Sequence, residues 1–72
     1  MYVIKFDNGL YWCGYNKADM QIRKAVIYKS IKKAFEVGKD CLNRKKYIFP
    51  RTLMSNVKDF KIVSVSLKEC EE

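Results

Sequence analysis

Residues 2–15 read YVIKFDNGLYWCGY, and this stretch decides the fold. Residues 2–6 and 10–15 are two short runs rich in β-branched and aromatic side chains, which are typical of β-strands. Asn8 and Gly9 lie between them, and both residue types tolerate the positive φ angles of a two-residue type I′ turn. The stretch therefore predicts an antiparallel β-hairpin.

The register of this hairpin decides which side chains share a face. With a two-residue loop, Lys5 lies opposite Trp12, which then points away from the apolar face. A three-residue loop with a bulge shifts the pairing by one residue and places Tyr11 beside Lys5 instead. Trp12 is thus either an exposed contact, stacking on a base or anchoring a protein interface, or a packed residue. In the second case the shifted register places it in the core, or the loop at residues 16–23 covers it.

The segment after the hairpin predicts a loop followed by a third strand. Residues 16–23 show no clear period, so we expect a long loop there. Lys24–Lys29 (KAVIYK) reads as a strand, and Ser30 after it is a good helix N-cap. Tyr15, before the loop, is expected to be a core or cross-strand residue.

From Ile31 the apolar period changes to that of a helix, which we expect to run to about Lys46. Gly38 lies on the apolar side of this helix, where it weakens the helix but lets a sheet approach closely. The apolar positions are Ile31, Ala34, Phe35, Gly38, Cys41 and Leu42.

The C-terminal part predicts one more strand. Residues 47–59 form a connection with a short helical turn near Leu53 and Met54. Residues 61–67 alternate as a strand, with Val63 on one face and Ile62 on the other, and the charged residues 68–72 form a frayed end. Residues 1–72 therefore predict a single α+β domain, β-β-β-α-β. One antiparallel sheet of about four strands carries one helix on one face and leaves its other face uncovered.

The charge of the chain is concentrated in its middle. The 72 residues carry 15 Lys and Arg against 8 Asp and Glu, for a formal charge of +7. Residues 17–61 hold thirteen basic and four acidic residues, a local charge of +9. On the helix, Glu36 and Asp40 allow the ordinary interpretation of a solvated, partly compensated face. No acidic residue lies between Asp40 and Asp59, so the field there is positive.

These observations select the candidate residues for binding a protein or a nucleic acid. They are Lys5, Trp12, Arg23, Lys24, Lys29, Arg44, Lys45, Lys46 and Arg51.

Residues that carry chemistry are few. The chain has no His, and its three cysteines, Cys13, Cys41 and Cys70, are widely spaced and odd in number. Structural zinc sites normally take four closely spaced Cys or His ligands, and a nucleophile paired with His cannot be built within the chain. We therefore expect no enzyme activity, no metal and no cofactor, and reduced thiols. Since the sequence shows neither a secretory signal nor a membrane span, we expect a cytoplasmic protein without membrane contact.

Two stretches carry a resemblance to known proteins. YVIKF and YWCGY of the hairpin, followed by AVIYKSIKKA (residues 25–34), resemble small single-domain proteins encoded by phages and prophages. These include anti-CRISPR and other anti-defence inhibitors, which dock onto a host effector and block its nucleic-acid site. The resemblance implies a non-enzymatic inhibitor or modulator of a host nucleic-acid-handling complex, such as a CRISPR-Cas effector, acting in the host cytosol.

The strand followed by Ser30 and Ala34 early in a helix is also similar to the arm-type DNA-binding domains of tyrosine recombinases, which lay a three-stranded sheet in the major groove. This second resemblance implies the alternative function, sequence-tolerant binding of DNA or RNA. The basic sheet face and the Lys/Arg cluster at the helix C-terminus would make the contacts. For either function the chain is a monomer or, through its free sheet edges, a two-fold homodimer.

Overall fold

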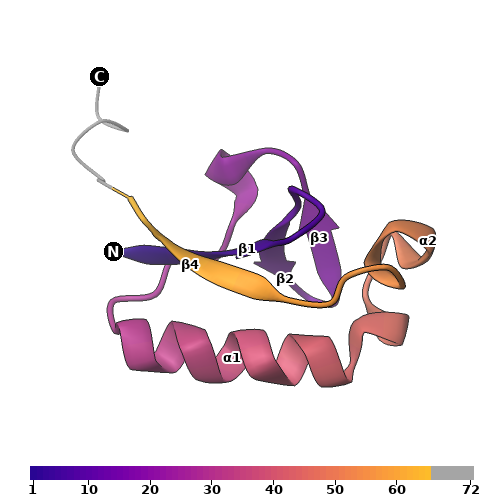
Figure 1. Cartoon of the computed structure of the whole chain (residues 1–72). Helices are drawn as coiled ribbons and strands as arrows, with labels where there is room; N and C mark the ends of the chain where they lie inside the picture. Colours follow the sequence, from indigo (N-terminus) through magenta and orange to yellow (C-terminus); the bar gives the residue numbers. More distant parts are fainter. Residues whose placement is uncertain (66–72) are drawn as a thin grey trace.

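The main helix α1 lies across one face of a four-stranded sheet in the computed structural model, which describes residues 1–65 (Figure 1). The elements are β1 (Tyr2–Phe6), β2 (Tyr11–Gly14), β3 (Lys17–Asp19), the 3-10 helix η1 (Ile22–Lys24), α1 (Ile31–Asn43), the 3-10 helix η2 (Lys45–Tyr47), α2 (Arg51–Met54) and β4 (Phe60–Ser64). All neighbouring strands are antiparallel, in the order β3-β2-β1-β4. The predicted fold class is confirmed, whereas the predicted frayed end at 68–72 lies outside the described residues.

Leu10 still bonds to Phe6, so the turn of the first hairpin consists of residues 7–9. The two-residue turn is therefore wrong, and the three-residue alternative is confirmed. Lys5 pairs with Tyr11, and the Phe6 N–H donates to the Leu10 carbonyl at 2.7 Å. Gly9, with φ of +90°, donates its N–H to the Phe6 carbonyl at 3.0 Å. The physical reason is that this loop requires a positive φ only at a glycine, whereas a type I′ turn requires it at two residues.

The observed register turns Trp12 into the core, which corrects its predicted role as a surface contact. Its side chain shares the face toward α1 with Ile4 and Phe6 and is only 6% exposed. The indole N–H donates to the hydroxyl of Tyr28 at 3.2 Å. A buried tryptophan needs such a partner, and Trp12 has one, so it stabilises the fold.

The third strand is residues 17–19, and the predicted strand at 24–29 is wrong. The chain reverses directly after β2 through Gly14, Tyr15 and Asn16, whose φ angles are 79°, 51° and 56°. Two consecutive residues in the left-handed region suit a tight hairpin turn, so β3 returns at once beside β2. Gly14 and Asn16 are the only turn-forming residues here and Tyr15 is not one, so the sequence predicted a loop rather than a tight hairpin turn.

The segment between β3 and α1 covers part of the face that was expected to be open. In Figure 1 this segment arches over the side of the sheet opposite α1. Val3, on that face, is 1% exposed, and Ala25 of the arching segment is 8% exposed. Farther along, Tyr28 forms an isolated bridge to Tyr2, with N–H to carbonyl distances of 2.8 and 2.7 Å. The expectation of an uncovered outer face is therefore corrected.

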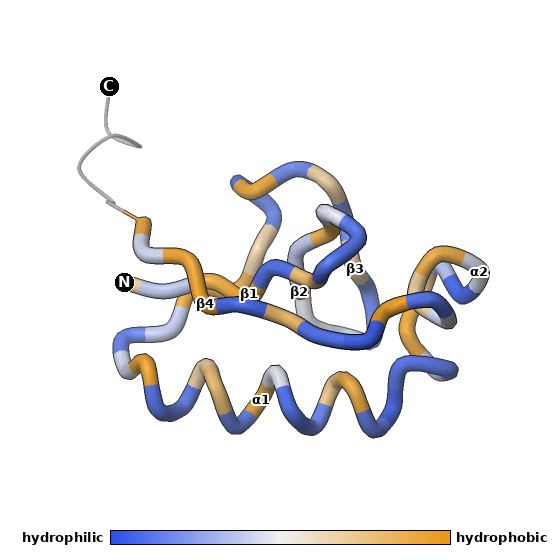
Figure 2. Tube along the Cα trace, in the orientation of Figure 1, coloured by the Kyte–Doolittle hydropathy of each residue, from blue (hydrophilic) through white to orange (hydrophobic). Residues whose placement is uncertain are grey.

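Helix α1 begins as predicted and ends before its predicted limit, because residues 45–47 tighten into η2. The Ser30 hydroxyl accepts the N–H of Lys33 at 3.3 Å and so caps the first turn. Figure 2 shows apolar positions recurring along the side of α1 toward the sheet. A Cβ atom at Gly38 would overlap the ring of Phe60, so this glycine allows the helix to lie against β4, as expected.

The connection from η2 to β4 closes one end of the core. The predicted helical turn is α2, and Met54 at its end is fully buried together with Ile48 and Val57. β4 begins at Phe60, and its alternation is confirmed: Ile62 packs against the core, while Lys61 is exposed on the outer face.

Candidate nucleic-acid interface

The structure divides the predicted binding residues among several places. Trp12 is buried; Lys5 lies on the outer face of the sheet; Arg23 and Lys24 belong to η1; Lys29 precedes α1; and Arg44, Lys45, Lys46 and Arg51 follow one another around the end of α1. They do not form a single patch, so the local environment of each group decides what it can bind.

A hollow along β3 brings members of two of these groups together. It has a volume of about 540 Å³ and is lined by Cys13, Lys17, Ala18, Asp19, Lys24, Phe49 and Pro50. We call it the β3 hollow. The segment before α2 is held beside β3, because the Ala18 N–H donates to the Phe49 carbonyl at 2.7 Å and the Phe49 N–H to the Asn16 carbonyl at 2.8 Å. Backbone pairing thus places Phe49 where the lysines of β3 and η1 converge.

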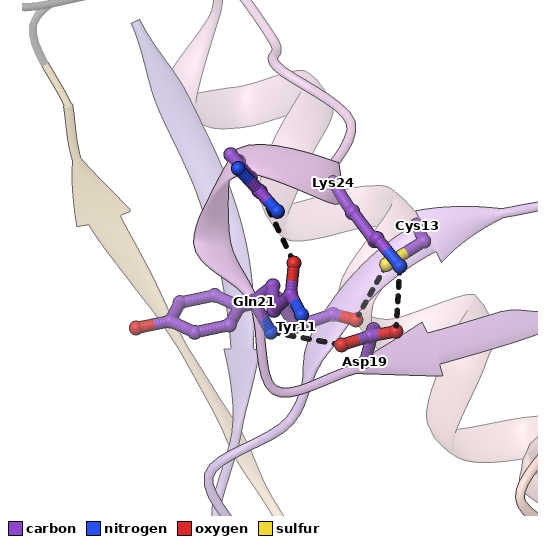
Figure 3. Close-up of polar contacts among 6 residues, drawn as sticks. Tyr11, Cys13, Asp19, Gln21 and Lys24 are labelled. Atoms are coloured by element: carbon purple, nitrogen blue, oxygen red, sulfur yellow. Dashed lines mark hydrogen bonds and ion pairs between the residues drawn. The ribbon is translucent and has the colours of Figure 1, made fainter.

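The β3 hollow carries two lysines and one carboxylate. Lys24 Nζ lies 3.6 Å from the Asp19 carboxylate, and both side chains are substantially exposed, so the pair is weak (Figure 3). The N–H of Gln21 donates to the same carboxylate at 2.9 Å; this bond, followed by Lys24, lowers the pKa of Asp19. Lys17 is exposed and adds a second positive charge, so the hollow has a net positive charge.

An exposed aromatic ring, that of Phe49, lines the hollow. The ring of Phe49 is 52% exposed, and the guanidinium carbon of Arg51 lies 4.8 Å from its centroid. Tyr15, in the β2–β3 turn, is 96% exposed, which corrects the expectation of a core or cross-strand residue. Its neighbour Asn16 accepts the backbone N–H of Phe49, so this turn lies next to the segment that carries Phe49. Exposed rings next to cations suit stacking on nucleic-acid bases.

The cluster at the end of α1 is partly engaged in internal contacts. Arg44 pairs with the Asp40 carboxylate at 2.8 Å, and Lys45 Nζ donates to the backbone carbonyl of Val57. Lys45 therefore holds η2 against the segment before β4. Lys46 is exposed, with its Nζ 5.3 Å from the Tyr47 ring centroid. Arg51, whose guanidinium lies over the Phe49 ring, adds a cation beside the β3 hollow.

Lys5 lies in a different environment. A second hollow of about 460 Å³ contains Lys5 and Lys61, but Asp7 and Asp59 line it as well. Two carboxylates beside two ammonium groups leave little net charge for attracting an anion. This hollow is therefore a weaker candidate for binding phosphate than the β3 hollow.

The surroundings of Cys13 and Cys41, the two described cysteines, favour the protonated thiol. Burial, followed by the charge of Asp19, raises the pKa of Cys13, whose Sγ donates to the Tyr11 carbonyl at 3.4 Å (Figure 3). Burial raises the pKa of Cys41 to about 12. A protonated thiol is a poor nucleophile, so these two groups act as packing residues. Within residues 1–65, no three His, Cys, Asp or Glu side chains gather into a set that could hold a metal ion.

Sequence reasoning missed three residues of this corner: Tyr15, Lys17 and Phe49. The only local signal for them was the run Gly-Tyr-Asn at residues 14–16, which forms the turn that brings β3 back. Phe49 is distant in sequence from β3, and no periodicity predicts their pairing.

Comparisons of the chain with protein-family models, with curated proteins and with solved structures found no match. In the described part of the chain, no helix has the length and apolar character needed to cross a membrane.

Proposed function

We propose that the protein binds single-stranded DNA or RNA with little sequence preference, through the β3 hollow and the adjoining Arg51 and Lys46. The observation that carries this proposal is Phe49, half-exposed and flanked by Arg51, at the mouth of a hollow that holds Lys17 and Lys24. Lysines and arginines neutralise phosphates, while an aromatic ring accepts any base, so this combination needs no base-specific hydrogen bond.

The arrangement fits a single strand better than a duplex. Reading a duplex in the major groove requires a protruding helix or an open two-stranded ribbon. The segment before α1 covers part of the outer sheet face (Figure 1). The sheet docking implied by the recombinase resemblance therefore has only part of that face available, whereas the exposed ring of Phe49 can stack on an unpaired base.

Inhibition of a host nucleic-acid-handling complex stays a prediction. The expected docking anchor for it, Trp12, is buried, so an inhibitor would have to use another surface. The β3 hollow offers one, since a ribonucleoprotein effector carries RNA that the hollow suits. A tagged pull-down from host lysate, with and without nuclease, distinguishes a partner held through RNA from one held by protein contacts alone.

The direct test is fluorescence anisotropy with a labelled twelve-nucleotide oligo-dT at several salt concentrations. We expect log K to fall with log salt by about 0.7 for each phosphate neutralised. Replacing Lys17 and Arg51 with Gln should weaken binding by about tenfold and reduce that slope by about 1.4.

The matched control replaces Lys29 and Lys33 with Gln, which removes the same charge at exposed positions away from the hollow. If both double variants lose the same affinity, the binding depends on net charge alone and the assignment of the site is wrong. If no salt-dependent binding is measurable, the proposed function is wrong.

A further inference from the structure

The two edges of the sheet differ in whether their outer side is paired. β3 and β4 are the edge strands. β3 is paired on its outer side by a bridge between Lys17 and Phe49. Among residues 1–65, nothing pairs with the outer side of β4. An open edge presents backbone donors and acceptors to any extended chain that approaches it.

The backbone groups that β4 presents can be identified from its register. The Val65 N–H donates to the Met1 carbonyl at 2.9 Å, and the Asp7 N–H donates to the Asp59 carbonyl at 3.1 Å. Because hydrogen-bonded positions alternate in an antiparallel ladder, Lys61 and Val63 also turn their backbone groups toward β1. The N–H and C=O groups of Ile62 and Ser64 therefore point outward, away from β1.

An apolar strip of α1 lies beside this edge. Ile31 and Phe35, one turn apart on the helix, are 55% and 51% exposed. The rings of Phe35 and Phe60 are 5.4 Å apart, so this side of α1 faces β4. A strand added to β4 would therefore place alternate side chains over these two residues.

Lysines flank the open edge on both sides of the sheet. On the helix side, Lys39 Nζ lies 5.5 Å from the Phe35 ring centroid. On the outer face, Lys61 lies directly opposite Lys5, and like charges in that position repel each other. Asp7 and Asp59 offset the charge of Lys5 and Lys61 in the hollow at the start of β4. Farther along the edge, residues 62–64 carry no acidic side chain, and the formal charge of the whole chain, +7, favours carboxylates on an added strand.

We propose that β4 accepts an extended acidic segment of a partner protein as a fifth strand. The backbone groups of Ile62 and Ser64 bond to the segment, its apolar side chains cover Ile31 and Phe35 on the helix side, and its carboxylates lie on the outer face beside Lys61. A second copy of the chain fits less well, because each copy carries a formal charge of +7 and brings its own lysines to the same edge. This inference does not depend on nucleic-acid binding at the β3 hollow.

The test uses a fluorescein-labelled eight-residue peptide of alternating Val and Glu, with an alternating Val and Lys peptide for comparison. We expect the acidic peptide to bind at least about tenfold more tightly than the basic one. In amide spectra of the isotope-labelled protein, Ile62 and Ser64 should shift and become protected from hydrogen exchange. Residues 15–19 and 44–51 should not shift, since the peptide does not touch the β3 hollow.

Two pairs of variants make the test specific. Ser64→Pro removes one outward N–H without breaking the ladder to β1, so it should abolish peptide binding, whereas Ser64→Ala should retain it. Replacing Lys39 and Lys61 with Glu should weaken binding by about tenfold, whereas the same change at Lys29 and Lys33 should have a much smaller effect.

Three outcomes would overturn the proposal: equal binding of the acidic and basic peptides, equal binding by the two Ser64 variants, or no peptide binding at all. Concentration-dependent dimerisation in analytical ultracentrifugation that Ser64→Pro abolishes would also overturn it, because it would make a second copy the occupant. All these readouts are independent of oligo-dT affinity, so this proposal and the proposed function can fail separately.

Discussion

Trp12 and Phe49 are two aromatic residues of this small protein, one buried and the other exposed. Trp12 is 6% exposed, under α1, and its indole N–H is bonded to Tyr28. Phe49 is 52% exposed, and it is fixed by its backbone to β3 while its ring lies against Arg51. Trp12 belongs to β2 and Phe49 bridges β3, so an aromatic residue at this sheet can be either a core residue or an exposed one. The difference is that the Trp12 side chain is packed and hydrogen-bonded, whereas only the backbone of Phe49 is hydrogen-bonded to the sheet.

The comparison predicts that the two regions respond to different measurements. Changes under α1 should lower the free energy of unfolding, whereas changes at the β3 hollow should lower affinity for oligo-dT and leave the fold intact. Each of the following variants or conditions tests one side of this division.

Trp12→Ala should have the largest effect. Truncating a buried tryptophan costs about 3–5 kcal/mol, and a domain of this size has a net stability of only about 3–5 kcal/mol. We expect the variant to be largely unfolded by circular dichroism. Trp12→Phe, which keeps a ring and loses the bond to Tyr28, should retain a cooperative urea transition. Wild-type stability in Trp12→Ala would mean that Trp12 does not lie in the core.

Gly38→Ala should also destabilise the protein, although alanine favours helices. The added methyl overlaps the ring of Phe60, and overpacking of this kind typically costs about 1–3 kcal/mol. Urea denaturation measures the loss. Combining Gly38→Ala with Phe60→Leu should recover part of it, because the smaller side chain makes room. A stabilised Gly38→Ala would contradict the close approach of α1 to β4.

Phe49→Ala should lower the affinity for oligo-dT rather than the stability of the fold. Loss of base stacking costs about 1–3 kcal/mol per base, so affinity for oligo-dT should fall at least about fivefold. The half-exposed ring contributes little to the core, and the urea midpoint should change little. Phe49→Tyr keeps the stacking surface and is the matched control. If Phe49→Ala unfolds, or if its affinity for oligo-dT is unchanged, Phe49 is not a binding residue separate from the core.

The buried thiol of Cys41 gives the interior a pH dependence. Burial raises its pKa to about 12, from an ordinary value of 9.0, so above pH 9 the unfolded chain loses this proton while the folded chain keeps it. The stabilisation is complete below pH 9 and is lost as the pH rises toward 12. Urea denaturation should show about 1 kcal/mol less stability at pH 10 than at pH 8. In Cys41→Ala that difference should shrink; an equal difference would assign it to other groups.

Asp19→Asn should have the smallest effect. It removes the carboxylate from the β3 hollow, so oligo-dT affinity should rise, by no more than about threefold for so exposed a group. The pKa of Asp19 is lowered, so its carboxylate is charged throughout the neutral range. Titration of Asp19 should therefore not change the affinity of the wild-type protein for oligo-dT between pH 6 and 8. Decreased affinity in Asp19→Asn would mean that the carboxylate assists binding.

The sequence predicted the features that depend on local chemistry. Ser30 caps α1, the apolar period places α1 on the sheet, and Gly38 admits Phe60, all as expected from residue type and spacing. The fold class followed from these elements and from the alternation in β4.

The sequence did not predict features that depend on distant contacts. A loop of two or three residues gives different hairpin registers, and local sequence does not distinguish them. In the observed register Trp12 is buried in the core. The third strand was placed at residues 24–29, because KAVIYK has the composition of a strand, yet the Tyr15-Asn16 turn pairs residues 17–19 with β2 first. The basic cluster was found from charge alone, but its aromatic neighbours across the hollow were not, since only the folded chain brings Phe49 to β3.

The pairing of Phe49 with β3 also bears on how copies of this chain meet. A sheet with two open edges can stack copies head to tail, each adding its edge to the next, and grow into a fibre. Here the β3 edge is already paired from within the chain. Two copies that joined edge to edge at β4 would therefore present only their blocked β3 edges, so copies of this chain can pair through β4 without growing into a fibre.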